Sequence, residues 1–202
     1  ITTNFHDGMR MLEGAPAPVI PINGKDCLYF GGNNYLGLAS HPEVRDAAIQ
    51  AIRQFGVNTA ASRHTTGTTP LHTELEAALA AFKGQEEAVT FASGYLGNAI
   101  LMQVLQDRYD RILMDEATHP SLSGGIPHHI RKVEAFRHCD EKHLEELLQI
   151  PEQGNTLIIT DGVYALTGEI APLDAYYRLA RKYNALLLVD DAHATGILGE
   201  KG

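Results

Sequence analysis

Leu186-Leu187-Leu188-Val189-Asp190-Asp191-Ala192-His193 is an apolar run that ends in two acids and a histidine. Consecutive apolar residues of this kind are typical of a strand buried on both faces of a parallel sheet. A carboxylate at the end of such a strand is costly unless it meets a cation, and a metal ion, an arginine or a protonated ring nitrogen of a cofactor would each provide one. His193 can reach the same ligand as Asp190 if the chain turns there. The motif alone fits capping of the next element equally well.

Strands and helices alternate over most of the chain beyond residue 88. Short apolar stretches typical of strands occur at 88–91, 111–114, 132–136, 156–160 and 185–189. Between them, apolar residues recur at helical spacing after Ser93-Gly94, from His119, around 144–148 and over 173–183. This order predicts an α/β fold with a mainly parallel sheet and right-handed crossovers.

The segment 1–40 has a different pattern, because its prolines interrupt any continuous helix. Asn23-Gly24 lies between apolar arms and predicts a short hairpin over Val19–Phe30. Beyond this segment, apolar positions predict helical faces over 44–55 and 71–82, the second closed by Gly84. We therefore expect an N-terminal arm with a short hairpin at 1–40 and one α/β domain at 41–202.

Composition narrows the class of partner. The chain has 202 residues, with 16 Lys and Arg against 25 Asp and Glu, which gives a formal charge of −9. An acidic chain without a basic cluster argues against nucleic acid or an anionic membrane surface as partner. Cys27 and Cys139 lack the spacing of a zinc site or a disulfide framework. We therefore expect no metal site and a cytoplasmic location.

Polar residues and glycines follow the expected strands, and ligands of parallel α/β sheets bind beyond the carboxyl ends of the strands. The segments found there are Ser93-Gly94-Tyr95, Asp115 to His119, Asp161-Gly162-Val163 and Asp190 to His193. The backbone amides at the helix start after Ser93 can receive a phosphate, although a helix cap with a tight turn explains the same residues. No Walker loop, GxGxxG fingerprint or GxSxG elbow occurs, so nucleotide-binding and serine-hydrolase functions lose their main support.

Some histidines are candidates for function and others for structural roles. His119 lies at the predicted ligand edge, although a single histidine is more often structural than catalytic. His64 and His72 fit ordinary polar capping of a loop and a helix start. Three others have no partner at metal spacing and are expected at the surface: His128, His129 and His138.

A series of motifs resembles one enzyme family in order and spacing. The motifs are Asn33-Asn34-Tyr35-Leu36-Gly37-Leu38, Ser62-Arg63-His64-Thr65-Thr66-Gly67, His72-Thr73-Glu74-Leu75-Glu76, Ser93-Gly94-Tyr95, Thr118-His119-Pro120-Ser121, Asp161-Gly162-Val163-Tyr164 and Val189-Asp190-Asp191-Ala192-His193. Together they resemble the α-oxoamine synthases, pyridoxal-phosphate (PLP) enzymes of fold type I. The resemblance covers nearly all of Phe30 to Gly202 and implies PLP as cofactor and a three-layer fold type I large domain.

The resemblance assigns residues to two parts of the cofactor, its phosphate and its ring nitrogen. Ser93, Gly94 and Tyr95 match the phosphate-side loop, where amides at a helix start hold the cofactor phosphate. Asp190 matches the carboxylate that pairs with the ring nitrogen. Its negative charge keeps that nitrogen protonated, so the ring accepts electrons from the substrate α-carbon.

Four further residues take roles by the same resemblance. His119 matches the histidine that stacks on the ring and orients the substrate, and His193 matches the residue near the phenolic oxygen of the cofactor. Asp161 is assigned to support His119 as a neighbouring acid. Asn33 matches a position near the substrate.

The chain departs from the family pattern in two places. Ala165 stands where the family commonly has a serine that bonds the phenolic oxygen, so one contact is lost unless Thr167 or water replaces it. Asn58-Thr59-Ala60-Ala61 replaces a glycine-rich stretch before Ser62, which affects the expected contacts with the acyl thioester. We expect the lysine that binds the cofactor to lie beyond Gly202, so that these residues are the front part of a longer enzyme and do not turn over alone.

The function implied is condensation of an amino acid, such as glycine or alanine, with an acyl thioester on CoA or an acyl carrier protein. Carbon dioxide is lost and an α-amino ketone forms. The resemblance also implies a homodimer with active sites at the subunit boundary. Two alternatives stay open: another fold type I enzyme, either an aminotransferase or a carbon–sulfur lyase, and a non-catalytic fragment that binds cofactor or a partner.

Overall fold

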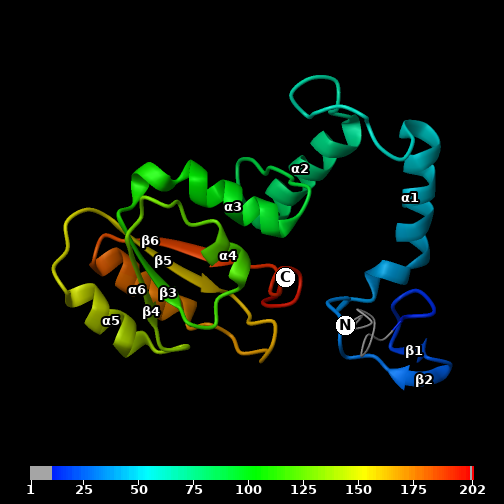
Figure 1. Ribbon diagram of the computed structural model, residues 1–202. Helices are drawn as coiled ribbons and strands as arrows, with labels where there is room; N and C mark the ends of the chain where they lie inside the picture. The colour runs from blue at the N-terminus through cyan, green and yellow to red at the C-terminus, as the bar shows by residue number, and fades with distance from the viewer. Residues whose placement is uncertain (1–10, 201) are drawn as a thin grey trace, which may run out of the picture. The chain divides into compact units, whose positions relative to one another are not determined.

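The computed structural model describes residues 11–200 and 202, and the chain divides into two compact units, Ile1–Thr90 and Phe91–Gly202 (Figure 1). Residues 1–10 of the expected arm lie outside the described part. The division into an arm at 1–40 and a domain at 41–202 stays a prediction.

The first unit contains the expected hairpin. Strand β1 (Val19–Ile22) pairs antiparallel with β2 (Lys25–Leu28), with Val19 opposite Leu28. Asn23 and Gly24 have φ values of 51° and 71°, the left-handed backbone that a two-residue turn of this type requires. The 3₁₀ turn η1 (Leu38–Ser40) follows.

Two helices complete this unit, α1 (Pro42–Phe55) and α2 (Pro70–Lys83). The Thr69 hydroxyl and the His72 ring form a capping box at the start of α2, so the capping role expected of His72 is confirmed. Gly84 ends α2 at a φ of 63°, as expected of a glycine just after a helix.

The second unit is built on a parallel sheet. Its strands are β3 (Arg111–Asp115), β4 (Lys132–Phe136), β5 (Thr156–Asp161) and β6 (Leu186–Asp190). The order is β4-β3-β5-β6 and every pairing is parallel. The helices are α3 (Gly94–Val104), η2 (Gln106–Arg108), α4 (Pro120–Gly124), α5 (Glu141–Gln149) and α6 (Leu173–Lys182). The predicted α/β class with a parallel sheet is confirmed.

Helices cover both faces of this sheet (Figure 1). Leu113 of β3 and Ile158 of β5 pack with Leu144 and Tyr176 of α5 and α6. On the opposite face, Ile112 packs with residues of α3, α4 and β5, namely Met102, Leu122, Leu157 and Ile159. Neighbouring residues of one strand thus belong to different cores, which the alternation of side chains along a strand requires. The unit has three layers, as predicted.

Two details of the expected sheet were wrong. Residues 88–91 form no strand; instead the Thr90 amide donates to the Glu76 carboxylate at 3.0 Å. A strand needs a neighbour for its backbone bonds, and in the described residues the 88–91 segment pairs with none. Strand β6 is only half-buried, not buried on both faces, because it lies at an edge of the described sheet.

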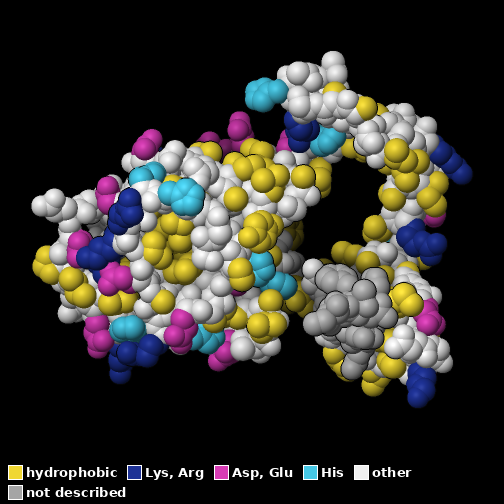
Figure 2. Space-filling model, in the orientation of Figure 1, with side chains coloured by type: hydrophobic (Ala, Val, Ile, Leu, Met, Phe, Trp, Pro, Cys, Tyr) yellow, Lys and Arg dark blue, Asp and Glu magenta, His cyan; other side chains and the backbone are white. Residues whose placement is uncertain are grey.

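Charged side chains of both signs are interspersed on the face of the second unit seen in Figure 2. In the part of the chain that the structure describes, no helix combines the length and the apolar character needed to cross a membrane.

Candidate functional site

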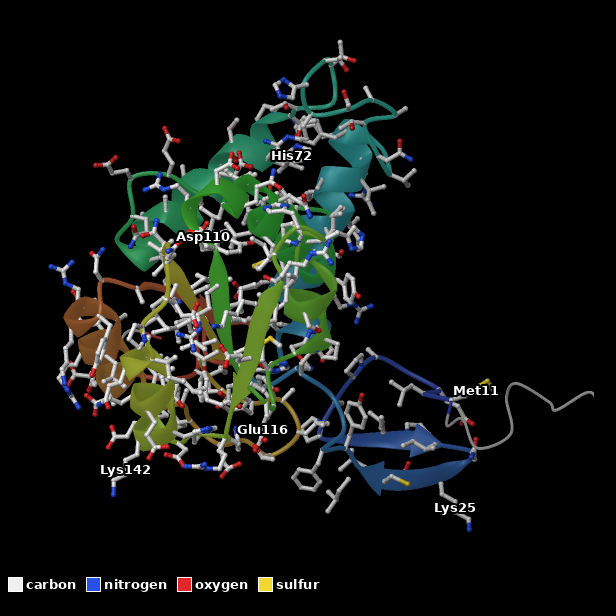
Figure 3. The ribbon with its side chains drawn as sticks, turned by 60° about the vertical axis from the view of Figure 1, so that its left-hand side comes forward. Met11, Lys25, His72, Asp110, Glu116 and Lys142 are labelled. Carbon is white, nitrogen blue, oxygen red and sulfur yellow. The ribbon has the colours of Figure 1, made fainter. Side chains whose placement is uncertain are left out.

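The carboxyl ends of the strands meet at one edge of the sheet. Strand β3 pairs with β4 on one side and with β5 on the other, so the chain reverses its direction of growth at this strand. Figure 3 labels Asp110 just before β3 and Glu116 just after it, which marks the carboxyl end. A crevice at such a reversal is the usual ligand site of an open α/β sheet.

A pocket of about 150 Å³ lies at this edge. It gathers residues that follow β3, β5 and β6 together with the start of α3: Gly94, Tyr95, Asn98, His119, Ser121, Asp161, Asp190, Ala192 and His193. Six residues of the sequence-based candidate site are in this set, namely Gly94, Tyr95, His119, Asp161, Asp190 and His193. Gly94 and Asp190, 96 positions apart in the sequence (190 − 94), therefore line one small cavity.

Ser93 and Gly94 form the start of α3. The Ser93 hydroxyl accepts from the Leu96 amide at 3.2 Å, so Ser93 is the helix cap that the simpler interpretation expected. A Cβ added at Gly94 would meet no atom within 4 Å. Because Gly94 lines the pocket, the missing side chain leaves space for a ligand beside the amides of the helix start.

Asp190 ends β6 with hydrogen bonds to both oxygens. Its Oδ2 accepts from Asn98 Nδ2 at 2.7 Å and its Oδ1 accepts from the Ala192 amide at 3.1 Å. A carboxylate has about four lone-pair positions, so Asp190 keeps acceptor capacity for a further donor. A protonated ring nitrogen is a donor of the required kind.

Asp161 pairs in register with Asp190 across β5 and β6, and its side chain is 4% exposed. Burial raises the pKa of Asp161, and the nearby charge of Asp190 adds to the effect. Its Oδ1 accepts from the backbone amide of His119 at 3.3 Å. Asp161 thus contacts the backbone of His119, and the supporting role expected of it stays a prediction.

Sequence reasoning missed two polar residues of the pocket, Asn98 and Ser121. Asn98 donates to Ser121 Oγ at 2.9 Å as well as to Asp190, and Ser121 Oγ lies 2.7 Å from His119 Nδ1. The only signals in the sequence were the position of Asn98 one turn after Gly94 and that of Ser121 two residues after His119.

Two further candidate residues, Asn33 and Thr167, are not among the residues that line this pocket. Asn33 is an exposed residue of the first unit, and its place near the substrate stays a prediction. Thr167, considered as a replacement for the serine missing at Ala165, accepts from the Glu169 amide at 3.3 Å within its own turn.

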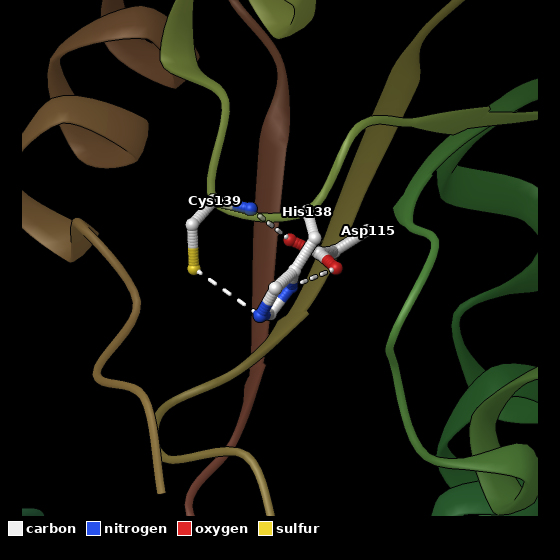
Figure 4. Close-up of side chains that lie close together, drawn as sticks. All are labelled: Asp115, His138 and Cys139. Carbon is white, nitrogen blue, oxygen red and sulfur yellow. Dashed lines mark hydrogen bonds and ion pairs between the residues drawn. The ribbon is translucent and has the colours of Figure 1, made fainter. Parts of the chain in front are cut away.

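Asp115, His138 and Cys139 form a second polar cluster (Figure 4). The Asp115 carboxylate is fully buried and accepts from the Ala117 and Cys139 amides and from His138 Nδ1, the last at 2.8 Å. The other ring nitrogen of His138 lies 3.0 Å from Glu169 Oε2. His138 was expected to be a surface residue with no partner at metal spacing, and this was wrong. Its side chain is 21% exposed and contacts Asp115 and Glu169, which are 23 and 31 residues away in the sequence.

Both ring nitrogens of His138 lie within hydrogen-bonding distance of a carboxylate. Burial would lower the pKa of His138, but the hydrogen bonds to Asp115 and Glu169 outweigh it, and the pKa is raised. A protonated imidazole donates from both nitrogens and so satisfies both carboxylates. The cluster ties the ends of β3 and β4 to the turn that contains Glu169.

Comparison with known proteins identifies the family. Residues 25–202 match the model of aminotransferase class I and II. The chain belongs to this family. Among curated relatives, the 8-amino-7-oxononanoate synthase of Citrifermentans bemidjiense is 46% identical over 98% of this chain, and 8-amino-7-oxononanoate synthase 2 of Bacillus subtilis is 41% identical over 98%. This chain spans 51% of the length of each of these two relatives.

Solved structures of related enzymes are also similar to this chain. Serine palmitoyltransferase of Sphingomonas wittichii superposes with a TM-score of 0.87 at 33% identity, covering 95% of this chain and 48% of the other. A variant of the S. paucimobilis enzyme, solved with PLP and myriocin, also gives 0.87 at 32% identity, covering 95% and 49%. The 8-amino-7-oxononanoate synthase of Francisella tularensis gives 0.69 at 26%, covering 86% and 48%. The resemblance to α-oxoamine synthases, the fold type I class and PLP as the cofactor of the family are confirmed.

The pocket of this chain fits that cofactor. Gly94 leaves room at a helix start for a phosphate, and Asp190 retains acceptor capacity for a ring nitrogen. Both features line one cavity, whose size suits a single small ring system.

Proposed function

We propose that the complete protein condenses a small amino acid with an acyl thioester, on CoA or an acyl carrier protein, and releases carbon dioxide and an α-amino ketone. The observation that carries the proposal is the single pocket that combines the start of α3, the Asp190 carboxylate and His119. The names of the relatives support the reaction class, since they are 8-amino-7-oxononanoate synthases and serine palmitoyltransferases.

Each pocket residue contributes a separate task. PLP, when bound, supplies an electron sink for the bond that breaks at the substrate α-carbon. The amides at the start of α3 hold the phosphate, with Gly94 giving access to them. Asp190 would accept a hydrogen bond from the protonated ring nitrogen and keep its charge positive. His119 would orient the amino acid at the cofactor, and His193 would contact the phenolic oxygen.

The remaining expectations belong to the same proposal. Asn33 lies near the bound substrate, and two copies of the complete chain form a homodimer whose active sites include residues of both. The enzyme acts in the cytoplasm, which the two cysteines, both free, favour.

The test is a product assay on the complete protein loaded with PLP. Glycine, alanine or serine is incubated with a series of acyl-CoA thioesters, and free thiol and amino ketone are measured. Release of CoA that depends on both substrates, with a matching amino ketone, is the expected result. Exchange of amino and keto acids without CoA release would instead identify an aminotransferase, and cofactor binding without turnover would identify a non-catalytic protein.

A further inference from the structure

Hydrogen bonds connect four side chains that line the pocket. Asp190 Oδ2 lies 2.7 Å from Asn98 Nδ2, Asn98 Nδ2 lies 2.9 Å from Ser121 Oγ, and Ser121 Oγ lies 2.7 Å from His119 Nδ1. Asp190 belongs to β6, Asn98 to α3, and Ser121 to α4, whose N-cap is His119. Three elements therefore contribute to one hydrogen-bonded series.

The first half of this series has a forced direction. A carboxylate only accepts hydrogen bonds, so the amide group of Asn98 must present its NH₂ to Asp190. One N–H of that group is used by Asp190, and the other donates to Ser121 Oγ. The Ser121 oxygen is thereby an acceptor on the Asn98 side and has its own proton free for His119.

The second half is fixed by two donors that meet at one nitrogen. The Ser121 hydroxyl contacts His119 Nδ1 at 2.7 Å, and the Ser121 backbone amide donates to the same nitrogen at 3.2 Å. A backbone N–H cannot accept, so this bond favours a lone pair on Nδ1, and the shorter bond from the Ser121 hydroxyl favours the same tautomer. The ring proton of a neutral His119 is then on Nε2.

We propose that Asn98 and Ser121 are positioning residues that hold His119 in the Nε2–H tautomer, so that it donates a hydrogen bond to the carboxylate of an amino-acid substrate. This inference rests on the proposed function for the identity of the ligand. A neutral ring stacks over a positively charged heterocycle without repulsion, and the N–H at Nε2 suits an anionic partner. The opposite tautomer would present a lone pair to the substrate carboxylate, and two acceptors repel.

The arrangement exceeds what capping of α4 requires. The bond from the Ser121 amide to Nδ1 already caps this short helix. Ser121 is 1% exposed, and the bond between its hydroxyl and Asn98 connects the cap to the Asp190 carboxylate. Asp190, which would accept from the ring nitrogen, and His119, which would orient the substrate, are thus connected by one series of bonds.

The test reads the tautomer directly. The complete protein, loaded with PLP and free of substrate, is labelled with ¹⁵N-histidine, and long-range ¹H–¹⁵N spectra assign the proton of His119, using His119→Gln to identify its signals. The wild type should show the proton on Nε2 alone. Ser121→Ala and the near-isosteric Asn98→Leu should each add signals of the second tautomer, and Ser121→Thr should restore the single pattern. Ser123→Ala is the matched control, because Ser123 also lies on α4 but its hydroxyl donates to the Pro120 carbonyl at 3.1 Å, and it should leave the pattern unchanged.

Each outcome decides a part of the proposal. A wild-type proton on Nδ1 overturns it without reference to any variant, as does an unchanged pattern in Ser121→Ala. A change in Ser121→Ala with none in Asn98→Leu removes Asn98 from the assignment.

A kinetic measurement then tests the role toward substrate. Ser121→Ala should raise KM for the amino acid about tenfold, the loss expected for one hydrogen bond to a charged group, and leave KM for the acyl thioester unchanged. An unchanged KM for the amino acid overturns the link to its carboxylate. If the protein performs no acyl transfer, the proposed function fails, while the tautomer spectra still decide the roles of Asn98 and Ser121.

Discussion

At the scale of single residues, Asp190 has two bonds from the protein and acceptor capacity for one more donor. Asp190→Asn keeps the shape of the side chain but removes the charge that keeps a ring nitrogen protonated. We expect turnover of the complete enzyme to fall at least about a hundredfold, in the range seen when one electrostatic contact to a reacting group is lost. Thermal unfolding should change little.

The neighbouring acid provides the control for this substitution. Asp191 accepts from the Thr195 hydroxyl at 2.8 Å and does not line the pocket. Asp191→Asn should therefore retain most of the activity. Equal losses in the two variants would show that the charge of Asp190 has no special role.

His138 gives a prediction about pH. Its pKa is raised in the folded protein, so its contribution to stability is complete below the unfolded value of about 6.5 and is lost as the pH rises through the folded value. His138→Gln keeps hydrogen-bonding groups but cannot titrate. Urea unfolding at a series of pH values gives the free energy of unfolding of both proteins. Above pH 6.5 this free energy should fall less steeply with pH in His138→Gln than in the wild type. Parallel curves for the two proteins would contradict the assignment.

The sequence could predict residues whose role follows from their position in one element. Gly94, His119 and Asp190 each come directly after an apolar strand or open a helix, so their place at the ligand edge was predictable. Asn98 and His138 were not, because their partners Asp190 and Asp115 are 92 and 23 residues away and belong to other strands. Only the folded sheet brings such groups within bonding distance.

At the scale of elements, periodicity predicted the helices and strands that have a buried face, such as β4 at 132–136. The 88–91 segment is equally apolar, but whether it pairs depends on a neighbour rather than on its own residues. Its Thr90 amide is bound by Glu76, whose pKa the Arg63 side chain and Thr90 lower to about 2. Local pattern cannot distinguish a strand from an extended segment held by a side chain.

Packing of α3 against α4 depends on Gly125. A Cβ at this position would lie 2.8 Å from the Ala99 backbone and 3.3 Å from Met102 Cγ. Gly125→Ala should force the two helices apart and lower the free energy of unfolding by about 1–3 kcal/mol, as overpacking does. Because α3 holds Asn98 and α4 holds Ser121, activity should fall as well.

Gly124→Ala is the matched comparison, because its Cβ would meet only the Tyr95 side chain, with the hydroxyl at 2.9 Å. That side chain is 58% exposed and can move. Urea unfolding should therefore show little loss for Gly124→Ala, and an equal loss in both variants would contradict the packing argument.

At the scale of the whole molecule, the alternation of elements was enough to predict an α/β fold with a parallel sheet, while its three layers were expected from the resemblance to the α-oxoamine synthases. The division of the chain at Thr90 was not predictable in this way. The boundary follows from how many contacts each segment makes with the rest, and a segment's pattern does not contain that information. The apolar positions of α1 show this, since the helix is amphipathic but has no buried residue.

The register of β5 and β6 places two acids, Asp161 and Asp190, side by side in the lining of the pocket. Burial raises the pKa of Asp161, and repulsion by the charge of Asp190 raises it further. A cationic ligand relieves this repulsion, so the protein should resist heat and proteases better with its vitamin-derived cofactor than without, and Asp161→Asn should narrow the difference in melting temperature. If the complete protein acts as proposed, a shortage of the cofactor would lower the amount of folded protein as well as its turnover.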